Sequence, residues 1–294
     1  MVVGQDIAGY RVLAHIGSGA ASELYCVQDP KTKQVWALKH VTKDTEKDQR
    51  FLDQVAHEYR IGSQLDHPNI RRVYRIIKHR KMFKVTDISL LMELVDAETL
   101  DQYRPKSCLE AVEIFAQAAW ALTHMHERGF VHADMKPSNV LVGSAQDVKI
   151  IDLGQACPIG TVKERIQGTP GYMAPEQAHR DAITPKTDIY NFGATMYWVL
   201  AREVIPTAMP PKDDGSSLYS GALDAGMVEP PVPPHEKNPA VHPLLSKLIL
   251  HSVEVELDKR PDSMEEVARR LDLIADLLRN PAKDSSIAKE GGAA

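Results

Sequence analysis

The feature that most constrains the fold of this chain is a change of sequence pattern near residue 99. Over residues 10–98, short apolar runs alternate with turn residues, as in β-strands, and one charged stretch at about 48–65 has a helical pattern. Farther along, apolar residues recur at helical spacing, and capping boxes at Ser107 and Ser263 indicate two helix starts. The sequence therefore predicts an α+β protein with a small β-rich lobe followed by a larger α-rich lobe.

Composition excludes several classes of protein. The 294 residues are 43% hydrophobic and 26% charged, which is typical of a soluble globular chain. The net charge of -5 argues against a dedicated nucleic-acid binder, and no apolar run reaches the roughly 18 residues that a membrane span needs. Cys26, Cys108 and Cys157 have neither disulfide-framework nor zinc-site spacing. We expect a cytoplasmic protein that binds neither nucleic acid nor membranes.

Two features of the β-rich lobe are compatible with phosphate binding. Gly17, Ser18 and Gly19 lie between two strand candidates and not between a strand and a helix, which favours a flap whose backbone N–H groups cover phosphates. A turn of this composition is more often only a hairpin. Lys39 follows the strand candidate 35–38, and a lysine at a strand end is usually solvated unless it has partners.

Three motifs follow one another in the helical half. Residues 132–139, His-Ala-Asp-Met-Lys-Pro-Ser-Asn, place an acid, a base and an amide in one short loop. Residues 148–151 are a strand candidate that runs into Asp152-Leu153-Gly154. The third motif is Gly-Thr-Pro-Gly-Tyr-Met-Ala-Pro-Glu at 168–176.

In this order the motifs resemble the eukaryotic-type (Hanks-type) protein kinase family over about 10–278, and the bacterial style of residues 173–177 is a weaker indication. The resemblance implies a bilobal protein-kinase fold, with a small antiparallel-sheet N-lobe carrying one main helix and a larger, mainly helical C-lobe. It divides the chain into a leader at 1–9, an N-lobe at 10–92, a hinge and C-lobe at 93–278, and a disordered tail at 279–294.

The resemblance also implies catalytic roles. Lys39 contacts the α- and β-phosphates of ATP and is held by an ion pair with a helix acid, for which Glu58 is the best candidate. Asp134 accepts the proton of the substrate hydroxyl, and Lys136 stabilises charge on the transferred phosphoryl group. The chemistry is positioning and electrostatics, because the phosphoryl group carries dispersed negative charge in the transition state.

Cofactor binding follows from the same resemblance. Asn139 and Asp152 are the implied ligands of Mg²⁺ or Mn²⁺, since amide and carboxylate oxygens suit hard cations. Met92 corresponds to the gatekeeper and residues 93–95 to the hinge. The implied ATP-binding residues are Ile16, Gly17, Ser18, Gly19, Ala20, Ala21, Ser22, Leu24, Ala37, Lys39, Met92, Glu93, Leu94, Val95 and Leu141.

The substrate class is implied as well. The Asp-x-Lys pattern and residues 168–172 resemble the serine/threonine branch, so protein substrates bearing Ser or Thr, including the protein itself, are expected. Ala133 replaces the arginine that usually precedes the loop aspartate and pairs with a phosphorylated activation-loop residue. The chain therefore lacks the Arg-Asp pair of the loop and is of the non-RD type. We expect that its activity is not gated by activation-loop phosphorylation. Thr161 is the one hydroxyl in 155–167.

Further residues are expected to stabilise the lobes. Glu176 and Arg260 resemble the family's buried ion pair, and Asp188 resembles the helix acid that anchors the catalytic loop. Ser22 stands where a third flap glycine is usual and cannot easily reach positive φ. Gly62 follows Glu58 by one helical turn and leaves a gap, which either Met92 or Tyr59 fills or which makes the helix mobile.

A basic run has no acid within it and is interpreted first as a solvated face, with partner docking as the minority alternative. It contains Arg71, Arg72, Arg75, Lys78, Arg80, Lys81 and Lys84.

Two alternatives to an active kinase remain. One is a weakly active or catalytically silent kinase-like scaffold that binds ATP, and the other is a kinase-fold enzyme acting on a small molecule. The oligomeric state is left open.

Overall fold

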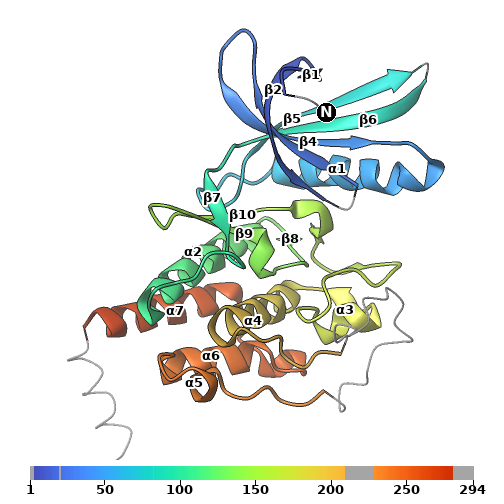
Figure 1. Cartoon of the computed structure of the whole chain (residues 1–294). Coiled ribbons are helices and arrows are strands. Elements are labelled where there is room, and N and C mark those ends of the chain that lie inside the picture. The colour runs from blue at the N-terminus through green and yellow to red at the C-terminus, as the bar shows by residue number, and fades with distance from the viewer. Residues whose placement is uncertain (1–2, 20, 82, 209–227, 281–294) are drawn as a thin grey trace, which may run out of the picture. The chain divides into compact units, whose positions relative to one another are not determined.

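The computed structural model describes residues 3–19, 21–81, 83–208 and 228–280 (Figure 1). They form two compact units. Unit 1 covers the described residues of Met1–Ala97 together with Ile151–Gln155, and unit 2 covers those of Glu98–Ile150 and Ala156–Ala294. The tail expected from residue 279 falls almost entirely outside the described residues, since only 279 and 280 are described.

Unit 1 contains a six-stranded antiparallel sheet with the order β1-β2-β3-β4-β6-β5. The strands are β1 (Asp6–Ile7), β2 (Tyr10–Ser18), β3 (Glu23–Gln28), β4 (Val35–Thr42), β5 (Val73–Lys81) and β6 (Lys84–Met92). β1 lies within the stretch expected to be a leader, and it joins the sheet because Ile7, 4% exposed, packs into the core.

Adjacent residues of the central strands supply the two faces of this sheet. Leu38 and Leu91 belong to one buried cluster, whereas their neighbours Ala37 and Leu90 belong to another, as the alternation of side chains in a strand requires. The second cluster also contains residues of helix α1 (Gln49–Gly62), which packs against β4, β5 and β6 (Figure 1). The helix expected at 48–65 is therefore confirmed, and its apolar side covers one face of the sheet.

Unit 2 is mainly helical. Its helices are α2 (Cys108–Glu127), α3 (Pro175–His179), α4 (Pro185–Ala201), α5 (Pro234–Lys237), α6 (Pro243–Ser252) and α7 (Met264–Arg279). α2 packs along α7, and α4 packs against both α6 and α7 (Figure 1). Ser107 and Ser263 cap α2 and α7, each accepting the backbone N–H three residues later at 3.1 Å. The α+β architecture predicted from the sequence is confirmed.

Short strands and 3-10 helices hold the loops of unit 2. These are β7 (Ala97–Thr99), β8 (Phe130–Val131), β9 (Val140–Gly143), β10 (Val148–Ile150), β11 (Cys157–Pro158), β12 (Thr161–Val162), β13 (Ala182–Ile183), η2 (Pro137–Asn139) and η5 (Leu257–Lys259). β11 pairs with β8, and β12 pairs with β13, so the segment after Asp152 is fixed beside the loop that follows β8. No helix among the described residues is long and apolar enough to cross a membrane.

Candidate active site

In unit 1 a lysine and two acids form a compact charged cluster. Lys39, on β4, donates from Nζ to Glu58 Oε2 of α1 at 2.7 Å and lies 3.4 Å from Asp152 Oδ1. The Glu58 side chain is only 2% exposed, whereas that of Asp152 is 40% exposed. Burial by itself would lower the pKa of Lys39, but the charges of Glu58 and Asp152 outweigh it and raise this pKa. The cluster therefore holds a cationic lysine beside a half-exposed carboxylate.

Local backbone geometry positions Asp152. Its φ of 62° lies in the left-handed region, and the 3-10 helix η3 (Leu153–Gln155) that follows packs against α1. A Cβ on Gly154 would lie 2.6 Å from Gln54 Nε2 of that helix, so a glycine permits the close approach. The arrangement leaves a carboxylate oxygen donor of the kind that suits Mg²⁺.

Gly62 adjoins the same cluster. A Cβ at this position would lie 2.8 Å from Val73 Cγ2 and 3.3 Å from Leu153 Cδ1. Val73 and Leu153, not Met92 or Tyr59, are therefore nearest to the space that the sequence analysis described as a gap. Because β5 carries Val73 into this space, the glycine is matched by a neighbouring side chain.

The turn between β2 and β3 has its own hydrogen bonds. Gly19 N donates to Ser22 O at 2.7 Å, and Ser18 Oγ donates to Glu23 Oε2 at 2.9 Å. Ser22 is not among the residues with positive φ, so serine is not strained there and the expected difficulty does not arise. A Cβ on Gly19, in contrast, would lie 2.7 Å from Ser22 Oγ. Ala20 lies outside the described residues.

The remaining residues of the implied ATP site are distributed over the units as follows. Ile16 and Leu94 in unit 1 are 44% and 38% exposed, whereas Ala37 and Met92 are buried within the sheet's core. Leu141, on β9 of unit 2, is 9% exposed. Gly17, Ala21, Leu24, Glu93 and Val95 all belong to unit 1. The segment 93–96 has no regular secondary structure.

In unit 2 the polar side chains of the short loop gather around Asp134. Thr169 Oγ1 donates to Asp134 Oδ1 at 2.8 Å, and Lys136 Nζ donates to Thr169 Oγ1 at 2.9 Å and lies 3.3 Å from Asp134 Oδ2. Asn139 Nδ2 donates to the Asp134 carbonyl at 2.8 Å, which orients its amide oxygen as the acceptor for a cation. The loop thus presents an acid, a cation and an oxygen donor together.

A buried carboxylate fixes the backbone of this loop. Asp188, at 0% exposure on α4, accepts from His132 N and Ala133 N at 2.8 Å each, and its Oδ2 is 2.8 Å from His126 Nε2. Ala133 has φ 59°, an uncommon conformation for a residue with a Cβ, and the two backbone hydrogen bonds hold it. The expected anchoring role of Asp188 is confirmed.

The segment after Asp152 brings a cation to the loop. Cys157 packs with Ala133 in a small buried cluster, and the half-buried Lys163 lies where it interacts with Cys157, Asp134 and Asp188. Burial lowers the pKa of Lys163, and those three groups oppose the lowering. The Lys163 side chain therefore lies near the loop acids, whereas Ala133 offers no cationic group there.

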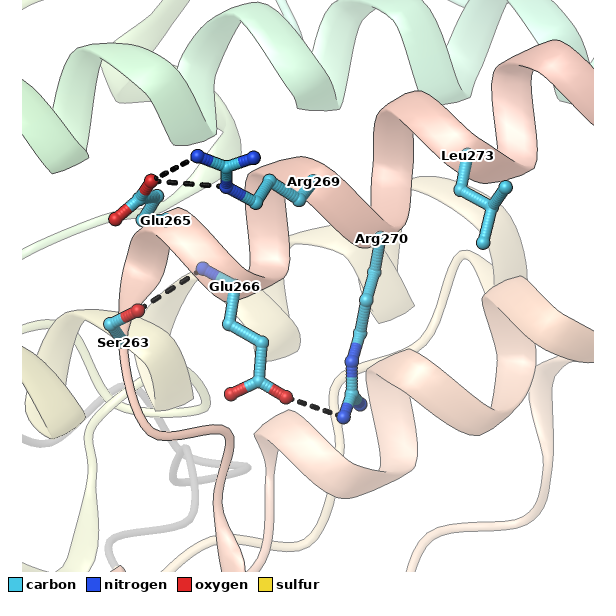
Figure 2. Close-up of a pocket in the computed structure, with 6 residues that line it drawn as sticks. All are labelled: Ser263, Glu265, Glu266, Arg269, Arg270 and Leu273. Carbon is cyan, nitrogen blue, oxygen red and sulfur yellow. Dashed lines mark hydrogen bonds and ion pairs between the residues drawn. The ribbon is translucent and has the colours of Figure 1, made fainter.

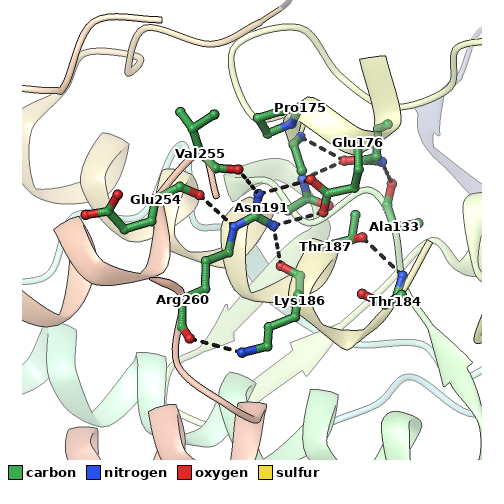
Figure 3. Close-up of polar contacts among 12 residues, drawn as sticks. Ala133, Pro175, Glu176, Thr184, Lys186, Thr187, Asn191, Glu254, Val255 and Arg260 are labelled. Atoms are coloured by element: carbon green, nitrogen blue, oxygen red, sulfur yellow. Dashed lines mark hydrogen bonds and ion pairs between the residues drawn. The ribbon is translucent and has the colours of Figure 1, made fainter. Parts of the chain in front are cut away.

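A buried ion pair braces unit 2 (Figure 3). Arg260 donates to both oxygens of Glu176 at 2.9 and 3.0 Å, and its remaining donors reach the carbonyls of Lys186, Glu254 and Val255. The Arg260 side chain is fully buried and also lies over the Tyr190 ring at 4.9 Å. The expected Glu176–Arg260 pair is confirmed, with every guanidinium nitrogen satisfied.

A surface pocket of about 370 Å³ along α7 contains none of these residues (Figure 2). Its lining is Ser263, Glu265, Glu266, Arg269, Arg270 and Leu273. Glu265 pairs with Arg269 at 2.7 Å and Glu266 with Arg270 at 2.5 Å, so the charges satisfy one another along one helix. This pocket therefore carries no candidate chemistry.

Three residues in or beside these clusters were not assigned a site role by the sequence analysis. Thr169 stands only within a motif, Arg71 only within the basic run, and Lys163 belongs to no motif. Each interacts with an acid of the clusters described above. No spacing signal distinguishes them, because their partners come from distant parts of the chain.

An antiparallel-sheet unit with a lysine–glutamate pair and a helical unit with an Asp-x-Lys-x-x-Asn loop are the two parts of the protein kinase fold. The sequence profile of the protein kinase domain matches residues 10–270, and the chain belongs to this family. The bilobal kinase fold implied by the sequence is thereby confirmed.

Curated bacterial proteins are similar to the chain. Serine/threonine-protein kinase PrkC of Bacillus subtilis is 29% identical over 276 residues, which cover 91% of this chain and 41% of PrkC. PknB of Mycobacterium leprae is 29% identical over 273 residues, which cover 90% of this chain and 42% of PknB. PknA of Mycobacterium tuberculosis is 29% identical over 269 residues, which cover 88% of this chain and 59% of PknA. The chain thus spans about two fifths of the length of PrkC and PknB.

Proposed function

We propose that this protein is an active serine/threonine protein kinase that transfers the γ-phosphate of ATP to hydroxyls of protein substrates, including itself. The observation that carries the proposal is the arrangement at Asp134, whose carboxylate contacts both Thr169 and Lys136. A silent scaffold has no need for such a group. The names of the bacterial relatives support the same reaction class.

The residues of unit 2 act on the substrate hydroxyl. Asp134 accepts the hydroxyl proton and orients the oxygen for attack, while Lys136 offers a positive charge to the transferred group. Thr169 connects the two side chains and limits their freedom, because its hydroxyl accepts from Lys136 and donates to Asp134. This fixed geometry lowers the reorganisation needed during transfer.

The residues of unit 1 hold the nucleotide. Lys39 contacts phosphate oxygens while Glu58 keeps its side chain in place, and the backbone of residues 17–22 covers the phosphates. Asp152 and Asn139 fit Mg²⁺ or Mn²⁺ as ligands, since both offer hard oxygen donors. The bound cation supplies neutralisation of the phosphate charge. Ile16, Leu24, Ala37, Met92 and Leu141 are the apolar residues proposed to contact adenine, with residues 93–95 as the hinge.

Activation requires no phosphorylated loop residue in this proposal. Ala133 offers no arginine for a phosphate, and the Lys163 side chain already lies near Asp134 and Asp188. Thr161 Oγ1 donates to the Pro158 carbonyl at 2.7 Å within a paired segment. The backbone pairing of β12 with β13 therefore holds this part of the segment without a phosphate on Thr161. We place the reaction in the cytoplasm, the compartment that the cysteine usage favours.

The test is transfer of label from γ-labelled ATP with Mg²⁺ to the protein itself and to a generic basic protein. Asp134→Asn keeps the side-chain volume but cannot accept the proton, and we expect a loss of about 10²- to 10⁴-fold. Asp258→Asn, an exposed aspartate of η5, is the matched control and retains the activity. Equal activity of wild type and Asp134→Asn contradicts the proposal.

The scaffold alternative gives a different result. It predicts no transfer by the wild type together with a rise in melting temperature on adding ATP. An enzyme acting on small molecules instead consumes ATP without labelling Ser or Thr residues. Phosphoamino-acid analysis of the labelled product separates these outcomes from a protein kinase.

A further inference from the structure

Arg71 differs from the other cations of the basic run. The remaining six side chains are exposed, which confirms the solvated-face interpretation for them: Arg72, Arg75, Lys78, Arg80, Lys81 and Lys84. Arg71 is half-buried and follows Ile70, whose side chain is 2% exposed. One member of the run is therefore directed into unit 1.

The backbone beside Arg71 is held near the charged cluster. Arg72 N donates to Glu93 Oε2 at 3.1 Å, and Glu93 N donates to Arg72 O at 2.9 Å. Burial alternates from Arg71 to Tyr74, with residues 71 and 73 on the covered side. Val73 lies at the Gly62 site together with Leu153, next to Asp152 in sequence. Arg71 thus enters unit 1 from the same side as Val73.

The guanidinium of Arg71 belongs electrostatically to the Lys39 cluster. It attracts the carboxylates of Glu58, Asp152 and Glu93, and it repels Lys39. Burial lowers the pKa of Arg71, and the three carboxylates oppose this effect. An arginine remains charged in proteins, so the cluster contains two cations.

The charges of the cluster explain why a second cation is needed there. Glu58 and Asp152 carry two negative charges, and Glu58 is almost fully buried. If Lys39 turned toward a phosphate and no second cation were present, the buried Glu58 would lack a compensating charge, and an uncompensated buried charge is strongly unfavourable. Lys39 and Arg71 together supply two positive charges to a cluster in which Glu58, Asp152 and Glu93 are the acids.

We propose that Arg71 is a positioning residue of this cluster: it keeps Glu58 and Asp152 neutralised, so that Lys39 can contact a phosphate without leaving Glu58 unpaired. The neutralisation is a property of the folded chain alone. The release of Lys39 rests on the proposed kinase function. The two parts are tested by separate measurements.

A double-mutant cycle on the nucleotide-free full chain tests the neutralisation. Lys39→Met and Arg71→Met each leave one cation beside Glu58, whereas the double variant leaves none. We expect the melting temperature of the double variant to fall at least about 3 °C more than the sum of the two single shifts. Additive shifts overturn the proposal.

Arg75→Met is the matched control, because it removes an exposed charge of the same run. The melting-temperature shifts of Arg75→Met and Lys39→Met should add in the double variant. If Arg75→Met is coupled to Lys39→Met as strongly as Arg71→Met is, the specific role of Arg71 is overturned. Arg71→Lys and Arg71→Gln cover the case in which Arg71→Met does not fold. The lysine variant should melt higher than the glutamine variant, and equal melting temperatures exclude a role for the charge.

The kinetic measurement tests the release of Lys39. Arg71→Met should lower kcat/KM for ATP by about tenfold, Arg71→Lys should recover part of it, and Arg75→Met should leave it unchanged. If the melting temperatures of the Lys39 and Arg71 variants are coupled but kcat/KM for ATP is unchanged in Arg71→Met, the positioning role is overturned. If the wild type transfers no phosphate, the proposed function fails, and the stability cycle still decides whether Arg71 neutralises the acids.

Discussion

Gly62 illustrates how one residue is defined by its neighbours. It is the last residue of α1, and a Cβ added there would contact Val73 Cγ2 at 2.8 Å and Leu153 Cδ1 at 3.3 Å. Glycine in a helix costs about 0.5–1 kcal/mol relative to alanine. Here that cost is offset because the missing side chain admits Val73. The position is tightly packed and contains no gap.

Replacing Gly62 by leucine should therefore destabilise the protein. Overpacking of a filled site typically lowers the free energy of unfolding by about 1–3 kcal/mol, which urea titration measures. The double variant Gly62→Leu/Val73→Ala restores space and should recover part of the loss. A single leucine variant as stable as the wild type contradicts this account of the packing, and increased basal transfer would favour a mobile helix instead.

At the scale of elements, the segment after Asp152 is organised by short strand pairs. β11 pairs with β8 through Cys157 and Val131, and β12 pairs with β13 through Thr161 and Ile183. Two threonines of this region have different surroundings. Thr161 bonds to a carbonyl of its own turn, whereas Thr169 bridges Asp134 and Lys136.

Alanine substitutions of these two threonines should differ in their effect on the rate of phosphoryl transfer. Thr161→Ala removes a local hydrogen bond and should retain activity within about twofold, since no phosphate is needed there. Thr169→Ala frees Asp134 and Lys136 and should lower kcat by about tenfold, the equivalent of one or two hydrogen bonds. Initial rates with saturating ATP and a basic protein substrate measure both. A nearly inactive Thr161→Ala protein disproves phosphorylation-independent activity.

At the scale of the whole molecule, buried charges join distant parts of the chain. Arg260 and Glu176 are 84 residues apart, and Asp188 accepts hydrogen bonds from backbone 55 and 56 residues away. Burial by itself would raise the pKa of Asp188, but the hydrogen bond and charge of His126, together with His132, hold this pKa below its usual value. Asp188 is thus ionised in the folded protein.

This lowered pKa predicts how stability depends on pH. Below about pH 4 the unfolded chain takes up the Asp188 proton before the folded protein does, so stability from this group is lost as pH falls through its folded pKa. Asp188→Asn leaves a buried N–H group unsatisfied and should cost about 1–3 kcal/mol at neutral pH. The stability difference from the wild type should narrow below about pH 4.

Denaturant unfolding at several pH values, with Asp258→Asn as the exposed control, measures this difference. The control should follow the wild type at every pH, because its side chain is exposed in η5. A constant gap between wild type and Asp188→Asn from pH 7 to pH 3 would show that ionisation of Asp188 does not stabilise the fold.

The sequence by itself determined the architecture and the motif residues of this protein. Period-2 and period-3.6 patterns and two capping boxes are local properties, so they predicted a β-rich lobe, a helical lobe and the starts of α2 and α7. Lys39, Asp134 and the other motif residues were found because their order along the chain resembles one family. That order required no knowledge of distances.

Only the tertiary structure decided which of several similar residues enter a charged cluster. Arg71 and Arg75 are the same residue type in one basic run, yet the first interacts with Glu58 and Asp152 while the second is exposed. Likewise the partners of Thr169 are more than 30 residues away. Burial and long-range charge depend on how segments distant in sequence pack together, and no local pattern contains that information.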